Sequence, residues 1–170
     1  MAIKPGERRL QILQTLAQML ETPKGEKITT AALAARLECS EAALYRHFAS
    51  KAQMFEGLIE FIEQSLVGVI NQITSDEAQG LKQVEAILGL LLSFAQKNRG
   101  MTRVLIGDAL VNENERLQGR INALLDKIEA ALKQALRIAA TQEPVKPDAD
   151  FAALANLLRC YVVGRWEQYA

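Results

Sequence analysis

The chain has 170 residues, of which 49 % are apolar and 24 % are charged, so it can bury a core and is not a disordered chain. The formal net charge is zero, but residues 1–51 carry eight Lys or Arg against five Glu, so a basic N-terminal part precedes an acidic remainder. A single histidine and two cysteines far apart argue against a metal site built from these residues.

The sequence shows no signal for targeting, for a cofactor or for catalysis. No apolar run follows Met1, and the longest apolar run, residues 86–95, is too short to span a bilayer. It contains no phosphate-binding glycine loop and no nucleophile elbow, and Cys39 and Cys160 lack metal-ligand spacing. We therefore expect a cytoplasmic protein that is not an enzyme and that uses no cofactor, no metal and no membrane partner.

The first expected helix spans residues 7–21 and follows a loose arm at residues 1–6. Its apolar residues recur at helical spacing, namely Leu10, Ile12, Leu13, Leu16, Ala17 and Leu20. Arg8 and Arg9 lie at the helix start, where the helix dipole disfavours cations. A phosphate partner would explain these two arginines, and an ordinary pair of solvated charges is an equally good explanation.

Residues 29–51 carry the pattern of a helix, a tight turn and a second short helix. Thr29 and Thr30 are candidate caps of the first helix, and Ser40 is a candidate cap of the second, at residues 41–48. The spacing of four apolar residues predicts a small shared core of Leu33, Leu37, Leu44 and Phe48. This is the plan of a helix-turn-helix, whose second helix lies in the DNA major groove, although similar three-helix units also occur without DNA.

The outward residues of the second helix suit contacts with DNA. Ala42 can touch a thymine methyl group, Arg46 can reach a guanine edge or a phosphate, and Tyr45 can bind phosphate or stack. Hydroxyl and amino groups at helix starts can meet phosphate oxygens. The expected DNA-binding residues are Thr29, Thr30, Ser40, Glu41, Ala42, Tyr45, Arg46, His47 and Lys51.

Five further helices are expected at residues 51–74, 81–98, 101–110, 112–139 and 148–170. In the first of them, one apolar stripe contains Met54, Leu58, Ile62, Leu66, Val69 and Ile73. Gly100 is expected in a helix C-cap region, and two prolines at residues 141–148 predict a loop. The amphipathic helix 112–139 is a candidate subunit interface.

The run LYRHF at residues 44–48, followed by Ser50-Lys51 and Met54-Phe55, resembles the signature of TetR-type DNA-binding domains. Further matches at residues 57–66 and 112–122 resemble the nucleoid occlusion factors of that family. The similarity covers most of residues 8–138. It implies an all-α fold with a three-helix helix-turn-helix head at residues 1–51 and a helical dimerisation and partner-binding body at residues 52–170.

The resemblance also implies partners. It implies a homodimer on double-stranded palindromic DNA, which then binds the C-terminal tail of the division protein FtsZ and inhibits division-ring assembly over the chromosome. The positions that match the family's tail groove are Phe61, Leu90, Lys97 and Asn98. Two positions depart from the family: its basic residue on the connecting helix falls at Val69 here, and a glycine falls at Ser93.

The sequence leaves two alternative functions to be considered, a ligand-responsive repressor and an enzyme, and it has an unusual end. The alternative function is a ligand-responsive TetR-type repressor, whose effector would enter an apolar pocket in the body. An enzyme would need a nucleophile or metal beside His47 and Glu41, and the sequence offers neither. Family chains continue with a loop and another helix after the position of Ala170, so we expect a shortened or divergent end.

Overall fold

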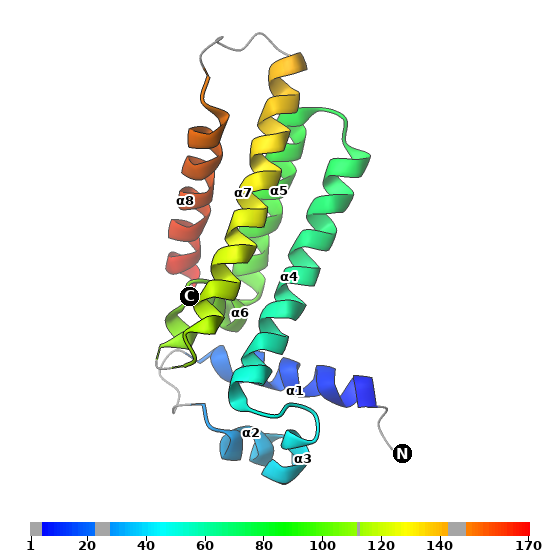
Figure 1. Ribbon diagram of the computed structural model, residues 1–170, viewed down its shortest axis with the longest axis vertical. Helices are drawn as coiled ribbons and strands as arrows, with labels where there is room; N and C mark the ends of the chain where they lie inside the picture. Colours follow the sequence, from blue (N-terminus) through cyan, green and yellow to red (C-terminus); the bar gives the residue numbers. More distant parts are fainter. Residues whose placement is uncertain (1–4, 23–27, 112, 143–148) are drawn as a thin grey trace.

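The computed structural model describes residues 5–22, 28–111, 113–142 and 149–170, and this part of the chain is helical without strands. Its elements are α1 (Pro5–Leu20), α2 (Thr30–Arg36), α3 (Glu41–Tyr45), α4 (Lys51–Asp76), α5 (Gly80–Lys97), α6 (Arg99–Leu105), η1 (Asp108–Leu110), α7 (Arg116–Gln142) and α8 (Phe151–Tyr169). The long helices α4, α5, α7 and α8 stand side by side, and α1, α2 and α3 gather at one end of them (Figure 1). The all-α prediction is confirmed.

Hydroxyl side chains cap the starts of three helices in and next to the head. The side-chain oxygens of Thr29, Ser40 and Ser50 each accept a hydrogen bond from a backbone N–H in the first turn of α2, α3 and α4, at 3.1–3.2 Å. Glu38 has a φ of 51°, so the turn between α2 and α3 passes through the left-handed region. The predicted shared core is confirmed, because all four of its residues are buried: Leu33, Leu37, Leu44 and Phe48.

Several expected boundaries and burial states differ from the structure. Pro5 and Gly6 belong to α1 rather than to a loose arm, and α3 ends at Tyr45 with a turn after it. The expected helix 101–110 is two elements, α6 and η1, separated by Gly107 with a φ of 83°. The part of the expected loop at residues 143–148 lies outside the described residues.

One residue of the predicted apolar stripe of α4, Val69, does not lie in the core. Val69 is 43 % exposed, whereas the next residue, Ile70, is 3 % exposed and packs in the core. Leu10 of α1 is likewise 40 % exposed rather than buried. Both three- and four-residue steps keep a side chain near one helix face, so the neighbouring helices decide which of the two is buried.

Gly100 lies inside α6, where it contacts α1, and does not cap α5. A Cβ atom at this position would lie 2.1 Å from the backbone oxygen of Ala17. The N–H of Gly100 donates to a carboxylate oxygen of Glu21 at 3.1 Å, and Arg103 Nη1 donates to the carbonyl of Leu20 at 3.0 Å. These contacts hold the C-terminal end of α1 against α6 of the body.

Replacing Gly100 by alanine is expected to lower the free energy of unfolding by about 1–3 kcal/mol, because the added methyl group meets backbone that cannot rotate away. Gly119 of α7 is the matched control, since its Cβ would meet nothing within 4 Å and alanine there should stabilise by about 0.5–1 kcal/mol. Urea unfolding of both variants measures the two effects. Equal effects at the two positions would contradict the close approach of α6 to α1.

Ion pairs connect α4 to the start of α7. Arg116 Nη2 lies 3.0 Å from Glu56 Oε1, and Glu63 binds both Lys127 and Arg120. The hydrogen bond from Lys127, together with both cationic charges, holds the pKa of the Glu63 carboxyl below its usual value. A carboxyl pKa that is lower in the folded state adds stability above the unfolded-state pKa, and this contribution is lost as the pH falls through the folded-state pKa.

Candidate DNA-binding surface and partner groove

The helix α3 presents an exposed face at the end of the head. Ala42, Tyr45 and Arg46 are exposed on it, and Tyr45 is 44 % exposed. Its inner side is anchored by Leu44, which is fully buried. A short helix with a buried inner residue and exposed small, aromatic and cationic residues has the form needed to enter a major groove.

Three expected DNA-binding residues form one hydrogen-bonded group across α2 and α3. Thr30 Oγ1 donates to Glu41 Oε2 at 2.5 Å, and the Tyr45 hydroxyl donates to Thr30 Oγ1 at 3.4 Å. The group fixes the carboxylate of Glu41 beside the exposed face of α3. A carboxylate accepts from a cytosine amino group and repels phosphate, so its position restricts what this face can approach.

The remaining expected DNA-binding residues make contacts within the protein, either as helix caps or with other side chains. Thr29 and Ser40 use their hydroxyl oxygens as helix caps. His47 is half-buried, and its backbone carbonyl accepts a hydrogen bond from Arg9 at 2.8 Å. Lys51 pairs with Glu113, a residue of the connection between η1 and α7, so its ammonium group already has a partner in the protein.

The two arginines of α1 make contacts within the head. Arg8 Nη2 donates to the carbonyl of Leu37 at 3.3 Å, and Arg9 donates to the carbonyl of His47. Both side chains therefore hold the helix-turn-helix rather than stand as a solvated pair. Their unfavourable place at the start of α1 was the sequence signal that they have partners elsewhere.

The four expected tail-binding residues come from two helices. Phe61 of α4 is half-buried and lines a small groove with Leu10 and Leu13 of α1. On α5, Leu90 is half-buried and Lys97 is exposed, while the amide of Asn98 donates to the carbonyl of Phe94 at 2.8 Å. The structure thus gives Phe61 and Lys97 accessible groups and gives Asn98 a structural contact.

The helix predicted as a subunit interface, residues 112–139, turns its apolar side inward. The apolar residues of α7 are buried against the other long helices, namely Leu117, Ile121, Leu124, Ile128, Leu132 and Ala135. Three of the large apolar residues that remain exposed lie together on α8, where Leu154, Leu157 and Tyr161 are 41 %, 64 % and 52 % exposed. The described part of α8 therefore has an exposed apolar face formed by these three residues.

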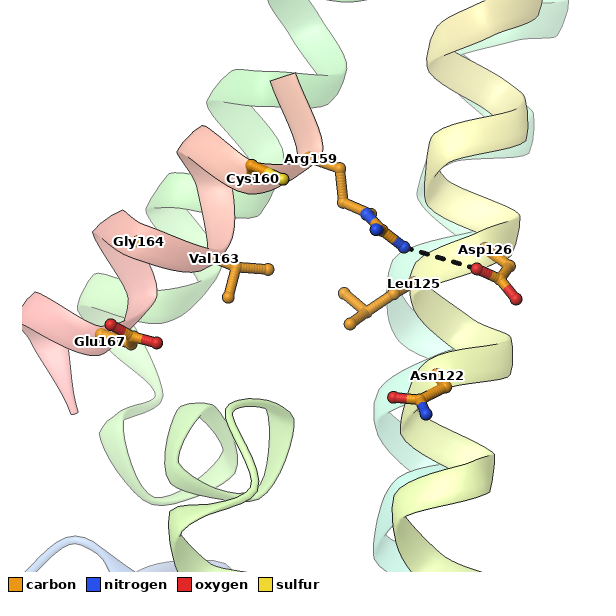
Figure 2. A pocket seen from close by; sticks show the side chains of 8 residues that line it. All are labelled: Asn122, Leu125, Asp126, Arg159, Cys160, Val163, Gly164 and Glu167. Atoms are coloured by element: carbon orange, nitrogen blue, oxygen red, sulfur yellow. Dashed lines mark hydrogen bonds and ion pairs between the residues drawn. The ribbon is translucent and has the colours of Figure 1, made fainter. Parts of the chain in front are cut away.

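A groove of about 660 Å³ runs between α7 and α8 beside this face. Val163 and Leu125 point toward one another across it, and Arg159 reaches over to Asp126 at 3.5 Å (Figure 2). Arg159 also lies 3.0 Å from Glu129, so ion pairs bridge the two helices at this end of the groove.

Within the described residues, no helix is both long enough and apolar enough to cross a bilayer.

Comparison with known families and structures accounts for both parts of the chain. Residues 25–58 match the family described as bacterial regulatory proteins, tetR family, and residues 78–170 match the tetracyclin repressor-like, C-terminal domain of the SlmA-like type. A TetR-family regulator from Agrobacterium tumefaciens superposes with a TM-score of 0.82 at 17 % identity, covering 97 % of this chain and 88 % of the other. A TetR regulator from Haloarcula marismortui gives 0.81 at 16 % identity, covering 96 % and 86 %.

Three curated relatives are far more similar in sequence, and each carries the name nucleoid occlusion factor SlmA. The protein of Idiomarina loihiensis is 53 % identical, and that of Shewanella oneidensis is 55 % identical, each over 99 % of this chain and 86 % of its own length. The protein of Shewanella amazonensis is 57 % identical over 95 % of this chain and 82 % of its own length. The chain therefore belongs to the TetR family and, within it, to the SlmA group of nucleoid occlusion factors.

Proposed function

We propose that this protein is a DNA-bound nucleoid occlusion factor, which binds the C-terminal tail of FtsZ and inhibits assembly of the division ring over the chromosome. The observation that carries the proposal is the identity of 53–57 % to nucleoid occlusion factors over nearly the whole chain. As a member of this family, the protein is a DNA-binding regulator and not an enzyme. It acts on the nucleoid, in the cytoplasm.

In this proposal the chain divides into a DNA-binding head at residues 1–51 and a dimerisation and partner-binding body at residues 52–170. Two copies pair through the exposed apolar face of α8 and present two α3 helices to successive major grooves, about 34 Å apart. The twofold symmetry of such a dimer demands a palindromic site. Direct contacts come from the exposed residues of α3, and Thr29 and Ser40 place the starts of α2 and α3 against phosphates.

Tyr45→Ala is expected to weaken binding to the palindromic duplex about tenfold, because it removes an aromatic contact and a hydroxyl group from the α3 face. Fluorescence anisotropy with a duplex selected by the protein from random sequence measures the affinity, and circular dichroism checks the helix content. Tyr45→Phe is the matched control, which keeps the ring and separates stacking from hydrogen bonding. Unchanged affinity in Tyr45→Ala would remove this face from the DNA interface.

The experiment that tests the function uses a fluorescent peptide of the FtsZ C-terminal tail, with and without that duplex. Saturable peptide binding that becomes tighter with DNA supports a DNA-bound FtsZ antagonist. Tight duplex binding without peptide binding would contradict the FtsZ step and favour a ligand-responsive repressor. Failure to select any preferred duplex would contradict sequence-specific DNA binding itself.

Phe61→Ala is expected to weaken peptide binding about tenfold and to leave duplex binding unchanged, since Phe61 is accessible on α4 and lies outside the α3 face. Leu81→Ala is the control, because Leu81 is an exposed apolar residue at the other end of α5. Anisotropy titrations with peptide and with duplex give the two affinities separately. Equal peptide affinity in the two variants would move the tail site away from Phe61.

A further inference from the structure

Two adjacent arginines of α1 reach two different helices of the head. Arg8 Nη2 donates to the carbonyl of Leu37, which is the C-cap of α2, at 3.3 Å. Arg9 Nη1 donates to the carbonyl of His47, in the turn that follows α3, at 2.8 Å. One side chain therefore binds the C-cap of α2, and its neighbour binds the turn that follows α3.

Arg9 also stacks on an aromatic ring that is itself fixed. Its guanidinium carbon lies 4.1 Å from the ring centroid of Phe48, which is 1 % exposed. A Cβ atom on Gly57 would lie 2.9 Å from an atom of this ring, so α4 also packs closely against it. The planar guanidinium group is thus held between a buried ring and a backbone carbonyl.

The placement has an electrostatic reason. Carbonyl groups at the C-terminal end of a helix lack intrahelical partners and carry the negative end of the helix dipole, so a cation there is favourable. The starts of α2 and α3 are fixed by their own caps, whereas Arg8 binds the C-cap carbonyl of α2 and Arg9 binds a carbonyl of the turn that follows α3. With only five residues, α3 is too short to maintain its direction alone, so its orientation depends on such tertiary contacts.

We propose that Arg8 and Arg9 are positioning residues for DNA recognition, which set the orientation of α3 against α1 instead of contacting phosphates. This inference rests on the proposed reading of DNA by α3. A misoriented α3 loses contacts to base edges but keeps the charge attraction to the backbone, so discrimination between DNA sequences falls more than affinity for DNA in general.

The test compares Arg9→Gln and Arg9→Lys with Arg137→Gln, a control that makes the same charge change on an exposed residue of α7. Each protein is titrated with its selected palindromic duplex and with a random duplex at several KCl concentrations. Arg9→Gln is expected to weaken specific binding about 5- to 10-fold and random binding less than about twofold, with an unchanged salt slope. Arg9→Lys retains the charge but not the planar group, so its discrimination stays below that of the unchanged protein. Arg8→Gln is expected to act in the same direction.

Two results would overturn the positioning role. Specific and random binding could fall together with a smaller salt slope, which would make Arg9 a phosphate contact. Discrimination could also stay at its original value in Arg9→Gln and Arg9→Lys, which would make the contacts to His47 and Phe48 dispensable. Circular dichroism and thermal melting show whether each variant is folded, so that loss of binding is not confused with unfolding. If Arg9→Gln does not fold, the binding data of Arg9→Lys test the positioning role. If the protein without any substitution does not distinguish the two duplexes, the proposed DNA reading by α3 is refuted, and the positioning role with it.

Discussion

The affinity of the dimer for its duplex is expected to fall about 1,000-fold between 50 and 200 mM salt, because each neutralised phosphate releases a bound counterion. Residues 1–51 contain eight Lys or Arg, of which Arg8 and Arg9 bond to backbone carbonyls and Lys51 pairs with Glu113. The five other basic residues of each head set an upper limit of about ten phosphate contacts for two heads, and about six such contacts give the 1,000-fold fall.

Anisotropy titrations at four KCl concentrations give the slope of log affinity against log salt. Arg46→Gln is expected to reduce the slope by about 2, one contact from each subunit, since Arg46 is exposed at the end of α3. Lys51→Gln is expected to change it less, because its ammonium group must first leave Glu113. A slope near zero would mean that the head does not bind the phosphate backbone at all.

Trp166→Ala is expected to lower the free energy of unfolding by about 3–5 kcal/mol. Trp166 is fully buried where α8 packs on α5, and its Nε1 donates to the carbonyl of Leu91 at 2.9 Å. Alanine would leave a cavity of nearly the whole indole ring and remove this bond between the helices. Because α8 also carries the exposed apolar face, the same variant is expected to weaken subunit pairing.

Urea unfolding followed by circular dichroism is the suitable measurement, since Trp166 is the single tryptophan and its fluorescence is lost with it. Trp166→Phe is the control, which refills most of the space and should cost clearly less than the alanine variant. A loss below about 1 kcal/mol in Trp166→Ala would mean that α8 is not anchored through this residue. Sedimentation of both variants reports whether pairing follows the anchoring of α8.

Features that depend on a few neighbouring residues could be predicted from the sequence. Thr29 and Ser40 cap their helices as expected, because a hydroxyl group satisfies a free N–H where a helix begins. The shared core of α2 and α3 could also be predicted, because the spacing of apolar residues along a helix sets which of them face the same side. The similarity to nucleoid occlusion factors also lay in short runs of residues, and the relatives confirm it.

Features that depend on which helices meet could not be predicted in this way. Val69 and Ile70 fit the helical period equally well, and the packing of α4 on its neighbours buries only Ile70. The amphipathic pattern of α7 did not show that its apolar residues are buried within the body, while α8 keeps three large apolar side chains exposed.

The roles of charged residues and of one glycine were decided by elements distant in sequence. The sequence suggested phosphate for Arg8, Arg9 and Lys51 but did not show their contacts within the protein, which are two backbone carbonyls of the head and the carboxylate of Glu113. Gly100 looked like a cap, but the backbone of α1 fills the space beside it. By itself, the sequence determined the helices, their caps and the family, since these follow from local hydrogen bonding and periodicity. Only the tertiary structure decided which charges are already paired and which apolar face stays open, because both depend on groups brought together by packing.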